Sequence, residues 1–444
     1  MDLQRFLKYI WLCIVAAVAL SFDRVVAAPA DAGQRPASWT ATPASASPAL
    51  KDAWDSYLGA LDEMRVFLES TSMFEHPMDR AKAYHSLMEM QAVAYNLIIA
   101  PRRTHPRILT NTALNTDIFT LGLQCPDSWY GLTFLDGQQT YRMSGRMGDI
   151  TFFSILVQDS IERNTRTVGS LNSSGMKLAK DGSFEIVLGG PQRAGNWIPL
   201  DPTLGFHYVL IRRTVLDWGN SDKGDLRVDR ITPIEPGHYD ADEFDEAAMA
   251  ERIRRAEAFI RYIPEKWIVG LYDAFIGPKQ EKNTMNLLPS STTNAASERT
   301  SNYVMGVFSL QADEALILSF ETAPDGAYWG FQLGDVWDRT LPYHERQTSL
   351  NMAQVHIEAN GELHVVISGQ DPGVANWLDT VGREEGEIVL RNYGSKVASV
   401  PTVRKMKFAD IAANLPPGTK MVSGEERQQS LEHRRLAVLR FFGE

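Results

Sequence analysis

Cysteine is almost absent from this chain of 444 residues, which contains only Cys13 and Cys125. Cys13 lies in an apolar N-terminal stretch that we expect to be removed, so a framework of disulfides is excluded. A lone cysteine such as Cys125, followed by Pro126, is a nucleophile in a minority of proteins and a packed, unreactive thiol in most.

Basic residues are fewer than acidic ones, and the formal net charge is −11. Proteins that bind nucleic acid need a basic surface to replace the counterions of the phosphates. We therefore predict no nucleic-acid partner. The same acidic balance argues against a polybasic membrane surface and otherwise indicates only solubility.

Long apolar runs are missing except near the N-terminus. Arg5 and Lys8 precede an apolar run from Ile10 to Phe22, and small residues follow up to Ala28. This order is typical of a secretory signal peptide, so we expect export to the periplasm or the outside of the cell. An uncleaved anchor is the alternative, but the run is shorter than the about 20 residues that a membrane-spanning helix needs. We expect no stable membrane span after the signal is removed.

The familiar catalytic signatures are missing as well. The sequence has no G-x-S-x-G elbow, no H-E-x-x-H pair, no phosphate loop and no dinucleotide fingerprint. His356 and His364 lie near a predicted turn, where separate strand positions are commoner than a metal pair. We predict neither a metal nor another cofactor. Without such a signature, the sequence does not identify a reaction.

The chain does contain an ordered series of segments. We predict a signal peptide at 1–28, a disordered linker at 29–48, a helical hairpin at 49–110, a first β-sandwich module at 111–235, a helical insert and linker at 236–300, a second β-sandwich module at 301–400 and a C-terminal helical segment at 401–444. The linker is rich in Ala, Pro, Ser and Thr, which bury too little apolar surface to fold.

Residues at a spacing of three to four predict the two helices of the hairpin. The first contains Trp54, Leu58, Leu61, Met64 and Leu68, and the second contains Tyr84, Met88, Gln91, Tyr95 and Ile98. We expect these two faces to pair and to pack on a later domain. Near the C-terminus, Ser423 and Glu426 have the spacing of a capping box at the start of a further helix.

Two regions have the pattern of antiparallel β-structure. Short runs of β-branched and aromatic residues alternate with turn signals such as Asp136-Gly137 and Asp181-Gly182. Many short strands at this spacing favour a mainly β fold of two tandem antiparallel sandwiches, of the jelly-roll kind, with helical additions.

The two β regions resemble each other. In both, a turn ending in glycine leads into a strand, then a Gly/Pro turn, then Asn196-Trp197 or Asn376-Trp377, then a strand ending in Arg212 or Arg391. Upstream, Ser128–Gly131 aligns with Asn302–Met305, and Gly148–Phe153 aligns with Asp325–Gly330. Duplication explains features that recur in the same order.

The repeated Asn-Trp pair has two interpretations. In the structural one, the tryptophan anchors a sandwich core and the asparagine hydrogen-bonds the backbone of its turn. In the functional one, both side chains line a cleft and hold a ligand. The first copy, Asn196-Trp197, has the character of scaffold, and the denser polar and aromatic surroundings of Asn376-Trp377 make the second copy the better candidate for a site.

With these residues in view, the chain resembles the bacterial domain-of-unknown-function family 1214, which is often paired with family 1254. The residues that carry the resemblance in the second region are Tyr328-Trp329, Trp337, Arg346–Asn351, Asp371-Pro372-Gly373 and Asn376–Asp379. In the first region they include Pro126-Asp127, Asp136-Gly137 and Gly195–Leu200. Cys125 departs from the family, which usually has Asn there. The resemblance implies tandem β-sandwich domains with helical additions and no particular activity.

The second β region supplies the candidate site. The predicted ligand-binding residues are Trp329, Trp337, Arg346, Gln347, Asn351, Asn376 and Trp377, and the predicted acid/base carboxylates are Asp335 and Asp379. An ion pair between the arginine and an aspartate is the purely structural alternative. Flat aromatic faces beside oriented donors suit a small polar-aromatic or carbohydrate-like ligand.

Three functions remain open on this basis. The first is a protein that binds a small molecule or a glycan through the second β-sandwich. The second is a periplasmic hydrolase or lyase that uses the carboxylates near the repeated motif. The third is a structural or assembly protein whose modules and helices form contacts in a homo-oligomer.

Overall fold

The computed structural model describes residues 45–103, 105–110, 119–163, 165–233, 245–276, 281–288, 301–395 and 397–442. The predicted signal peptide, nearly all of the predicted linker and most of the segment 277–300 lie outside these residues. The folded unit discussed below begins at Pro48. Within the described ranges, no helix combines the length and the apolar character needed to cross a membrane.

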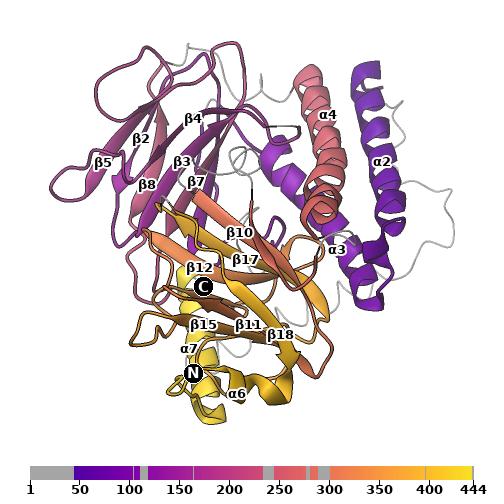
Figure 1. The fold of residues 1–444 in the computed structure, drawn as a ribbon. Helices are drawn as coiled ribbons and strands as arrows, with labels where there is room; N and C mark the ends of the chain where they lie inside the picture. The colour runs from indigo at the N-terminus through magenta and orange to yellow at the C-terminus, as the bar shows by residue number, and fades with distance from the viewer. Residues whose placement is uncertain are drawn as a thin grey trace, which may run out of the picture. The chain divides into compact units, whose positions relative to one another are not determined.

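The first module is a β-sandwich of two four-stranded sheets (Figure 1). One sheet has the order β1-β7-β3-β4 and the other the order β6-β5-β2-β8. The strands are β1 (Ser128–Leu135), β2 (Tyr141–Arg146), β3 (Phe152–Gln158), β4 (Thr167–Asn172), β5 (Ser183–Leu188), β6 (Trp197–Ile198), β7 (His207–Thr214) and β8 (Asp225–Arg230). A core that includes Phe153, Ile186 and Val209 lies between the sheets.

The second module repeats this arrangement. Its larger sheet has the order β13-β12-β17-β10-β9, with β14 also paired to β12, and its smaller sheet has the order β16-β15-β11-β18. The strands are β9 (Met285–Leu287), β10 (Ser301–Ser309), β11 (Glu314–Phe320), β12 (Tyr328–Asp335), β13 (Arg339–Thr340), β14 (Ser349–Asn351), β15 (Leu363–Ser368), β16 (Trp377–Asp379), β17 (Glu385–Tyr393) and β18 (Thr402–Lys407). The core between these sheets includes Phe308, Phe331 and Ile388.

The predicted fold class is confirmed, because both modules are β-sandwiches with the same strand order. Strands β1, β7 and β3 correspond to β10, β17 and β12, and strands β6, β5, β2 and β8 correspond to β16, β15, β11 and β18. The antiparallel prediction has one exception in each module. The short strand that begins with the repeated tryptophan pairs in parallel with its neighbour, β6 with β5 and β16 with β15.

The strand registers correct the predicted alignment of the repeats by one residue. Tyr130 pairs with Arg212 on β7, and Tyr303 pairs with Arg391 on β17, so Tyr130 corresponds to Tyr303. The alignment of the two sequences places Tyr130 opposite Val304 instead. Successive side chains of a strand point to opposite faces, so a shift of one residue would exchange the two faces of a sheet.

The sheet β1-β7-β3-β4 of the first module and the larger sheet of the second module are buried on both faces. Residues such as Phe152, Tyr208 and Leu210 point away from the first sandwich core and pack with Tyr328 and Tyr393 of the second module. Figure 1 shows β3 and β7 beside β10, β12 and β17. We call this shared layer the inter-module layer. It explains why strands β1, β3, β7, β12 and β17 are buried along nearly their whole length.

Three helices pack against the same layer. They are α2 (Pro48–Glu69), α3 (Pro77–Ala94) and α4 (Glu246–Tyr262). The predicted faces of α2 and α3 are only partly buried: Met64 and Leu68 are enclosed, but Trp54, Tyr84 and Met88 are exposed. The buried face of α3 differs from the predicted one for a physical reason. Helix α3 carries a second apolar series at the same spacing, Ala83, Leu87, Met90 and Ala94, and this series faces the core.

The C-terminal helix α7 (Gly424–Phe442) begins with the predicted capping box. The Ser423 amide donates to Glu426 Oε2 at 2.8 Å, and the Glu426 amide donates to Ser423 Oγ at 3.2 Å. The prediction is therefore confirmed. Helix α7 and the short helix α6 (Ile411–Asn414) lie along the second module in Figure 1.

Candidate functional site

The three tryptophans of the predicted site lie in three different hydrophobic clusters. Trp337 belongs to the inter-module layer, Trp329 to the core of the second sandwich, and Trp377 to a cluster with Val374 and Ile411. All three are buried. The structure therefore does not bring them together into one ligand surface.

The repeated asparagines hold the backbone in both modules. The Asn376 amide nitrogen donates to the carbonyls of His356 and His364, and its oxygen accepts from the His356 amide. Asn196 makes the equivalent bonds to both backbone groups of Lys177 and to the Glu185 carbonyl. The structural interpretation of the asparagine is confirmed in each copy.

The indole nitrogens of the two repeated tryptophans also bond to equivalent carbonyls. Trp197 Nε1 donates to the Gly189 carbonyl at 3.1 Å, and Trp377 Nε1 donates to the Ser368 carbonyl at 3.2 Å. The copies differ in what covers the ring. Trp197 is half-buried, whereas Trp377 is enclosed beneath Arg427 of α7.

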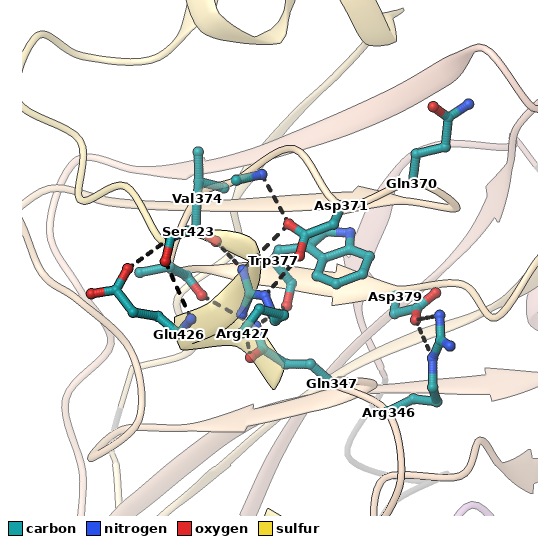
Figure 2. A network of polar contacts seen from close by, with 12 residues as sticks. Arg346, Gln347, Gln370, Asp371, Val374, Trp377, Asp379, Ser423, Glu426 and Arg427 are labelled. Atoms are coloured by element: carbon teal, nitrogen blue, oxygen red, sulfur yellow. Dashed lines mark hydrogen bonds and ion pairs between the residues drawn. The ribbon is translucent and has the colours of Figure 1, made fainter. Parts of the chain in front are cut away.

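Figure 2 shows how Arg427 covers Trp377. The guanidinium carbon lies 5.1 Å from the indole centre, and its nitrogens donate to Asp371, Gln347 and the Val374 carbonyl. Gln347 also donates to the Ala375 and Trp377 carbonyls. Gln347 and Trp377 are thus brought together as parts of a helix-docking network.

The predicted carboxylates are not brought together. Asp379 lies on β16 and is ion-paired with Arg346, whose Nε donates to Asp379 Oδ2 at 2.6 Å (Figure 2). Asp335 ends β12, in the other sheet, and its Oδ1 accepts from the Trp337 amide at 2.9 Å. Asp335 is buried, and this burial raises the pKa of its carboxyl.

Asn351, the remaining predicted residue, joins the two modules. Its side-chain nitrogen donates to Asp127 Oδ1 at 2.7 Å and to the Leu216 carbonyl at 3.1 Å. Asp127 also accepts from the Tyr328 hydroxyl at 2.7 Å and from Trp218 Nε1 at 2.9 Å. Burial nevertheless raises the pKa of this carboxyl, against the lowering effect of those donors.

Cys125 lies beside this network. Its sulfur is 3.1 Å from the Tyr328 hydroxyl, and its amide donates to the Tyr130 hydroxyl at 3.1 Å. Burial raises the pKa of the thiol. Because the thiolate is the nucleophilic form, this environment is that of a packed, unreactive cysteine.

The inter-module layer holds a pair of buried arginines at equivalent positions. The Arg212 guanidinium carbon lies 5.8 Å from the ring centre of Tyr130, and that of Arg391 lies 5.8 Å from the ring centre of Tyr303. Arg391 donates to Gln332 Oε1 and to the Leu123 carbonyl, both uncharged oxygens. No ion pair joins Arg391 to a carboxylate among the residues described.

Three buried carboxyls, those of Asp335, Asp338 and Glu387, lie in the region of Arg391. Burial raises the pKa of Asp338 to about 8 and raises the pKa of Glu387 well above its usual value, with a further rise in Glu387 from its acidic neighbours Asp338 and Asp335. Arg391 opposes both shifts. At neutral pH Asp338 and Glu387 therefore favour their protonated forms, and they neutralise Arg391 less than ionised groups would.

The turn that carries Asp338 has an uncommon backbone. Asp338 and Leu123 both have positive φ, 55° and 43°, and the Leu123 amide donates to the Asp338 carbonyl at 2.9 Å. Such conformations are costly for residues with side chains and concentrate at functional sites. The strained turn thus marks the same region as the buried carboxyls.

Two neighbouring ion pairs attach helix α3 to this region. Arg339 donates to Glu89, and Arg383 donates to Asp79. All four side chains are buried. No group of three or more histidine, cysteine, aspartate or glutamate side chains in the described ranges is arranged to hold a metal ion.

Five residues of this region are not among the site residues predicted from the sequence: Arg391, Asp338, Glu387, Tyr303 and Asp127. One signal is present there, because an arginine closes the equivalent strand in both copies, at Arg212 and Arg391. This signal does not reveal that one module packs on the other. That packing brings the equivalent strands into a common layer.

The family described as "Protein of unknown function (DUF1214)" matches residues 132–213 and 308–397, one segment in each module. Each repeat thus contains a segment that matches the model of this family. The sequence-based recognition is confirmed, and the tandem sandwich is the form that the two DUF1214 segments take in this chain. No curated protein matches the chain.

Two solved structures align with this protein over most of its length. One is an uncharacterised protein from Burkholderia cenocepacia, with 25% identity and a TM-score of 0.73, covering 81% of this chain and 98% of that one. Another, a protein from Vibrio parahaemolyticus, has 12% identity and a TM-score of 0.41, covering 81% of this chain and 100% of that one.

Proposed function

We propose that the protein is exported and binds a small polar-aromatic or carbohydrate-like molecule through the second β-sandwich, at its face in the inter-module layer. The ligand carries an anionic group that Arg391 recognises. Tyr303 forms the aromatic part of the site. Trp329 and Trp377 have no part in this proposal, because each lies within a separate core.

The proposal rests on one observation, that Arg391 is buried without a carboxylate partner among the described residues. The side chain is only 6% exposed, and its hydrogen bonds go to Gln332 and Leu123 rather than to a carboxylate. A buried cation is costly unless an anion pairs with it. An anionic ligand would supply that partner in a place where the charge is poorly screened.

The aromatic neighbours support the second half of the proposal. Tyr303 is only half-buried, so the layer approaches the surface at this side chain, and its hydroxyl lies 3.3 Å from that of Tyr393. The ring already faces the Arg391 guanidinium. A flat ligand or a sugar ring has apolar faces that suit such a side chain, and two hydroxyls can orient its polar edge.

Thermal-shift measurements with matched pairs of probes test the proposal. We expect benzoate or galacturonate to raise the melting temperature and the uncharged benzamide or galactose not to do so. A ligand at a hundred times its Kd stabilises the folded state by about 2.7 kcal/mol, which is readily measured. Equal effects of the charged and uncharged probes would contradict recognition by Arg391.

Variants identify the site. Arg391→Gln should remove the response to the charged probe, and Tyr303→Phe should weaken it, because the ring stays and the orienting hydroxyl is lost. If Arg391→Gln does not fold, the Tyr303→Phe variant still tests the proposed site. Arg346→Gln is the matched control, because Arg346 pairs with Asp379 outside the layer. Loss of the response in Arg346→Gln alone would place the ligand at the other sheet instead.

A hydrolase or lyase is the second candidate, favoured by the three buried carboxyls. Groups that keep their protons near neutral pH can act as general acids, and perturbed pKa values concentrate at active sites. Asp338→Asn and Glu387→Gln should then abolish turnover of a glycan or ester while the fold persists. Asp379 fits this role less well, since Arg346 already neutralises it.

A further inference from the structure

Two cations of the first module lie against one tryptophan. Arg213 of β7 pairs across the strands with Trp129 of β1, and its guanidinium carbon lies 3.4 Å from the centre of the indole. Lys223 Nζ lies 5.3 Å from the same centre. Successive side chains of a strand point to opposite faces, so Arg213 points away from Arg212 and the inter-module layer. This cluster is therefore separate from the site proposed at Arg391.

Neither cation is ion-paired with a carboxylate in the described part of the chain. Asp222 and Asp225, which lie next to Lys223 in the sequence, pair with Arg146 at 2.8 Å and 4.0 Å. Burial lowers the pKa of Arg213 to about 9, against the opposing effect of Asp225. Burial also lowers the pKa of Lys223, and the charge of Arg213 lowers it further. The two cations thus lack the anion that would offset their burial.

The hydrogen bonds of the two cations leave donors unused. Arg213 Nη1 donates to the Lys223 carbonyl at 3.1 Å, but its buried Nε has no partner among the described residues. Lys223 Nζ donates to the Phe441 carbonyl near the end of α7. An ammonium has three donors, and one edge of a guanidinium can bind two oxygens of the same anion. Both cations can therefore accept an oxyanion without losing these bonds.

The equivalent place in the second module is uncharged. Trp129 and Arg213 correspond there to a pair of asparagines on β10 and β17. These are Asn302 and Asn392. The second sandwich therefore forms without a cation at this point, and the module does not need the buried charge for its fold. A cation–π contact is weaker than the cost of burying an ion, so the contact with Trp129 does not explain the charge by itself.

We propose that this cluster binds a small dianion of the phosphate type. Two of its oxygens lie on the Nε edge of Arg213, and the Lys223 ammonium is the second attracting charge. Two positive charges match the double negative charge of the ion, and the attraction is strong where water is largely excluded. Trp129 and Lys223 are half-buried, whereas Arg213 is 2% exposed, so the cluster approaches the surface at the first two side chains.

Calorimetric titration of the full chain with phosphate tests the proposal, at constant ionic strength and about pH 8, where phosphate is a dianion. We expect saturable binding, and weaker binding of acetate, which carries one charge. Arg213→Asn, which introduces the residue type of the second module, should abolish phosphate binding. Lys223→Gln should raise the dissociation constant about tenfold. Arg227→Gln is the matched control and should change nothing, because Arg227 is an exposed arginine of β8 that pairs with Asp229.

Lysine labelling locates the ion and keeps the test valid if Arg213→Asn does not fold. Acetic anhydride reacts with the uncharged amine, and a bound anion favours the charged form. Phosphate should therefore slow the acetylation of Lys223 several-fold and leave the exposed Lys180 unaffected, as measured by peptide mass spectrometry. Equal rates for Lys223 with and without phosphate would overturn the proposal. So would phosphate binding that is lost in Arg391→Gln and kept in Arg213→Asn, because the ion would then lie in the inter-module layer.

The chain also carries a carboxylate that could compete with phosphate. Glu444 lies three positions after Phe441 in the sequence, and the Phe441 carbonyl accepts from Lys223. We expect Glu444→Gln to bind phosphate with the dissociation constant of the unsubstituted chain. Binding that appears only in Glu444→Gln would show that the cations serve a carboxylate of the chain itself, and the proposal of a phosphate site would be wrong.

Discussion

The guanidinium carbon of Arg391 lies 5.8 Å from the ring centre of Tyr303, and these two residues pair across β17 and β10. Arg212 and Tyr130 repeat the relationship across β7 and β1 at the same distance. Cation–π contacts of this kind gain strength when they are removed from water. The duplication has therefore placed the same pair on both sides of the inter-module layer.

The repeated asparagines should differ in how much they stabilise the fold. Asn376 is 8% exposed and Asn196 is half-buried, although both make three bonds to the backbone. We expect Asn376→Ala to lower the free energy of unfolding by about 2 kcal/mol, because it leaves buried backbone groups unpaired. Asn196→Ala should cost less, since water can replace its bonds. Urea unfolding measures both values, and a larger loss for Asn196→Ala would contradict this account.

Arg427 should be important for the attachment of α7. Arg427→Ala removes bonds to Asp371, Gln347 and the Val374 carbonyl and uncovers Trp377. We expect a loss of about 3 kcal/mol in the free energy of unfolding, with a red shift of tryptophan fluorescence. Arg435→Ala is the matched control on the same helix, because Arg435 only pairs with Glu432 on the surface. Equal effects of the two substitutions would show that Arg427 does not hold the helix.

The buried carboxyls should make stability fall as pH rises. The pKa of Asp338 is about 8 in the folded protein and that of an unfolded aspartate is about 3.9, so between these values only the folded state keeps the proton. Folding then binds protons, and stability is lost progressively from about pH 4 to about pH 8. Asp338→Asn should flatten this dependence and be relatively more stable at the alkaline end. Melting temperatures measured across this pH range test the assignment. If the melting temperatures of Asp338→Asn and of the unsubstituted protein changed equally with pH, the dependence would not come from Asp338.

Cys125 should resist thiol reagents. Burial raises the pKa of its thiol, and its side chain is enclosed beside Tyr328. In a Cys13→Ser variant, we expect no modification by iodoacetamide in native buffer and full modification in denaturant. Rapid native labelling would indicate an accessible thiolate and would reopen the nucleophile hypothesis.

Local sequence signals predicted the elements that depend on neighbouring residues. The capping box at Ser423 and Glu426, the β-sandwich class and the backbone role of Asn376 all follow from short-range chemistry. Helix faces were predicted less well. The spacing of Tyr84 and Met88 is helical, but Ala83 and Leu87 have the same spacing, and only the position of the β-modules decides which series is buried.

By itself, the sequence determined that the chain carries two copies of one β module. Strand patterns, turn glycines and the Asn-Trp pair each consist of residues that are close together in the chain, so they can be recognised without the fold. The tertiary structure alone decided which polar groups meet. Asp127 and Tyr328, more than two hundred positions apart, share a hydrogen bond because one sandwich packs on the other. Within the second module, the fold brings Asp338 near Glu387 and Arg391 of β17. Such contacts arise from burial between distant segments, which no local pattern records.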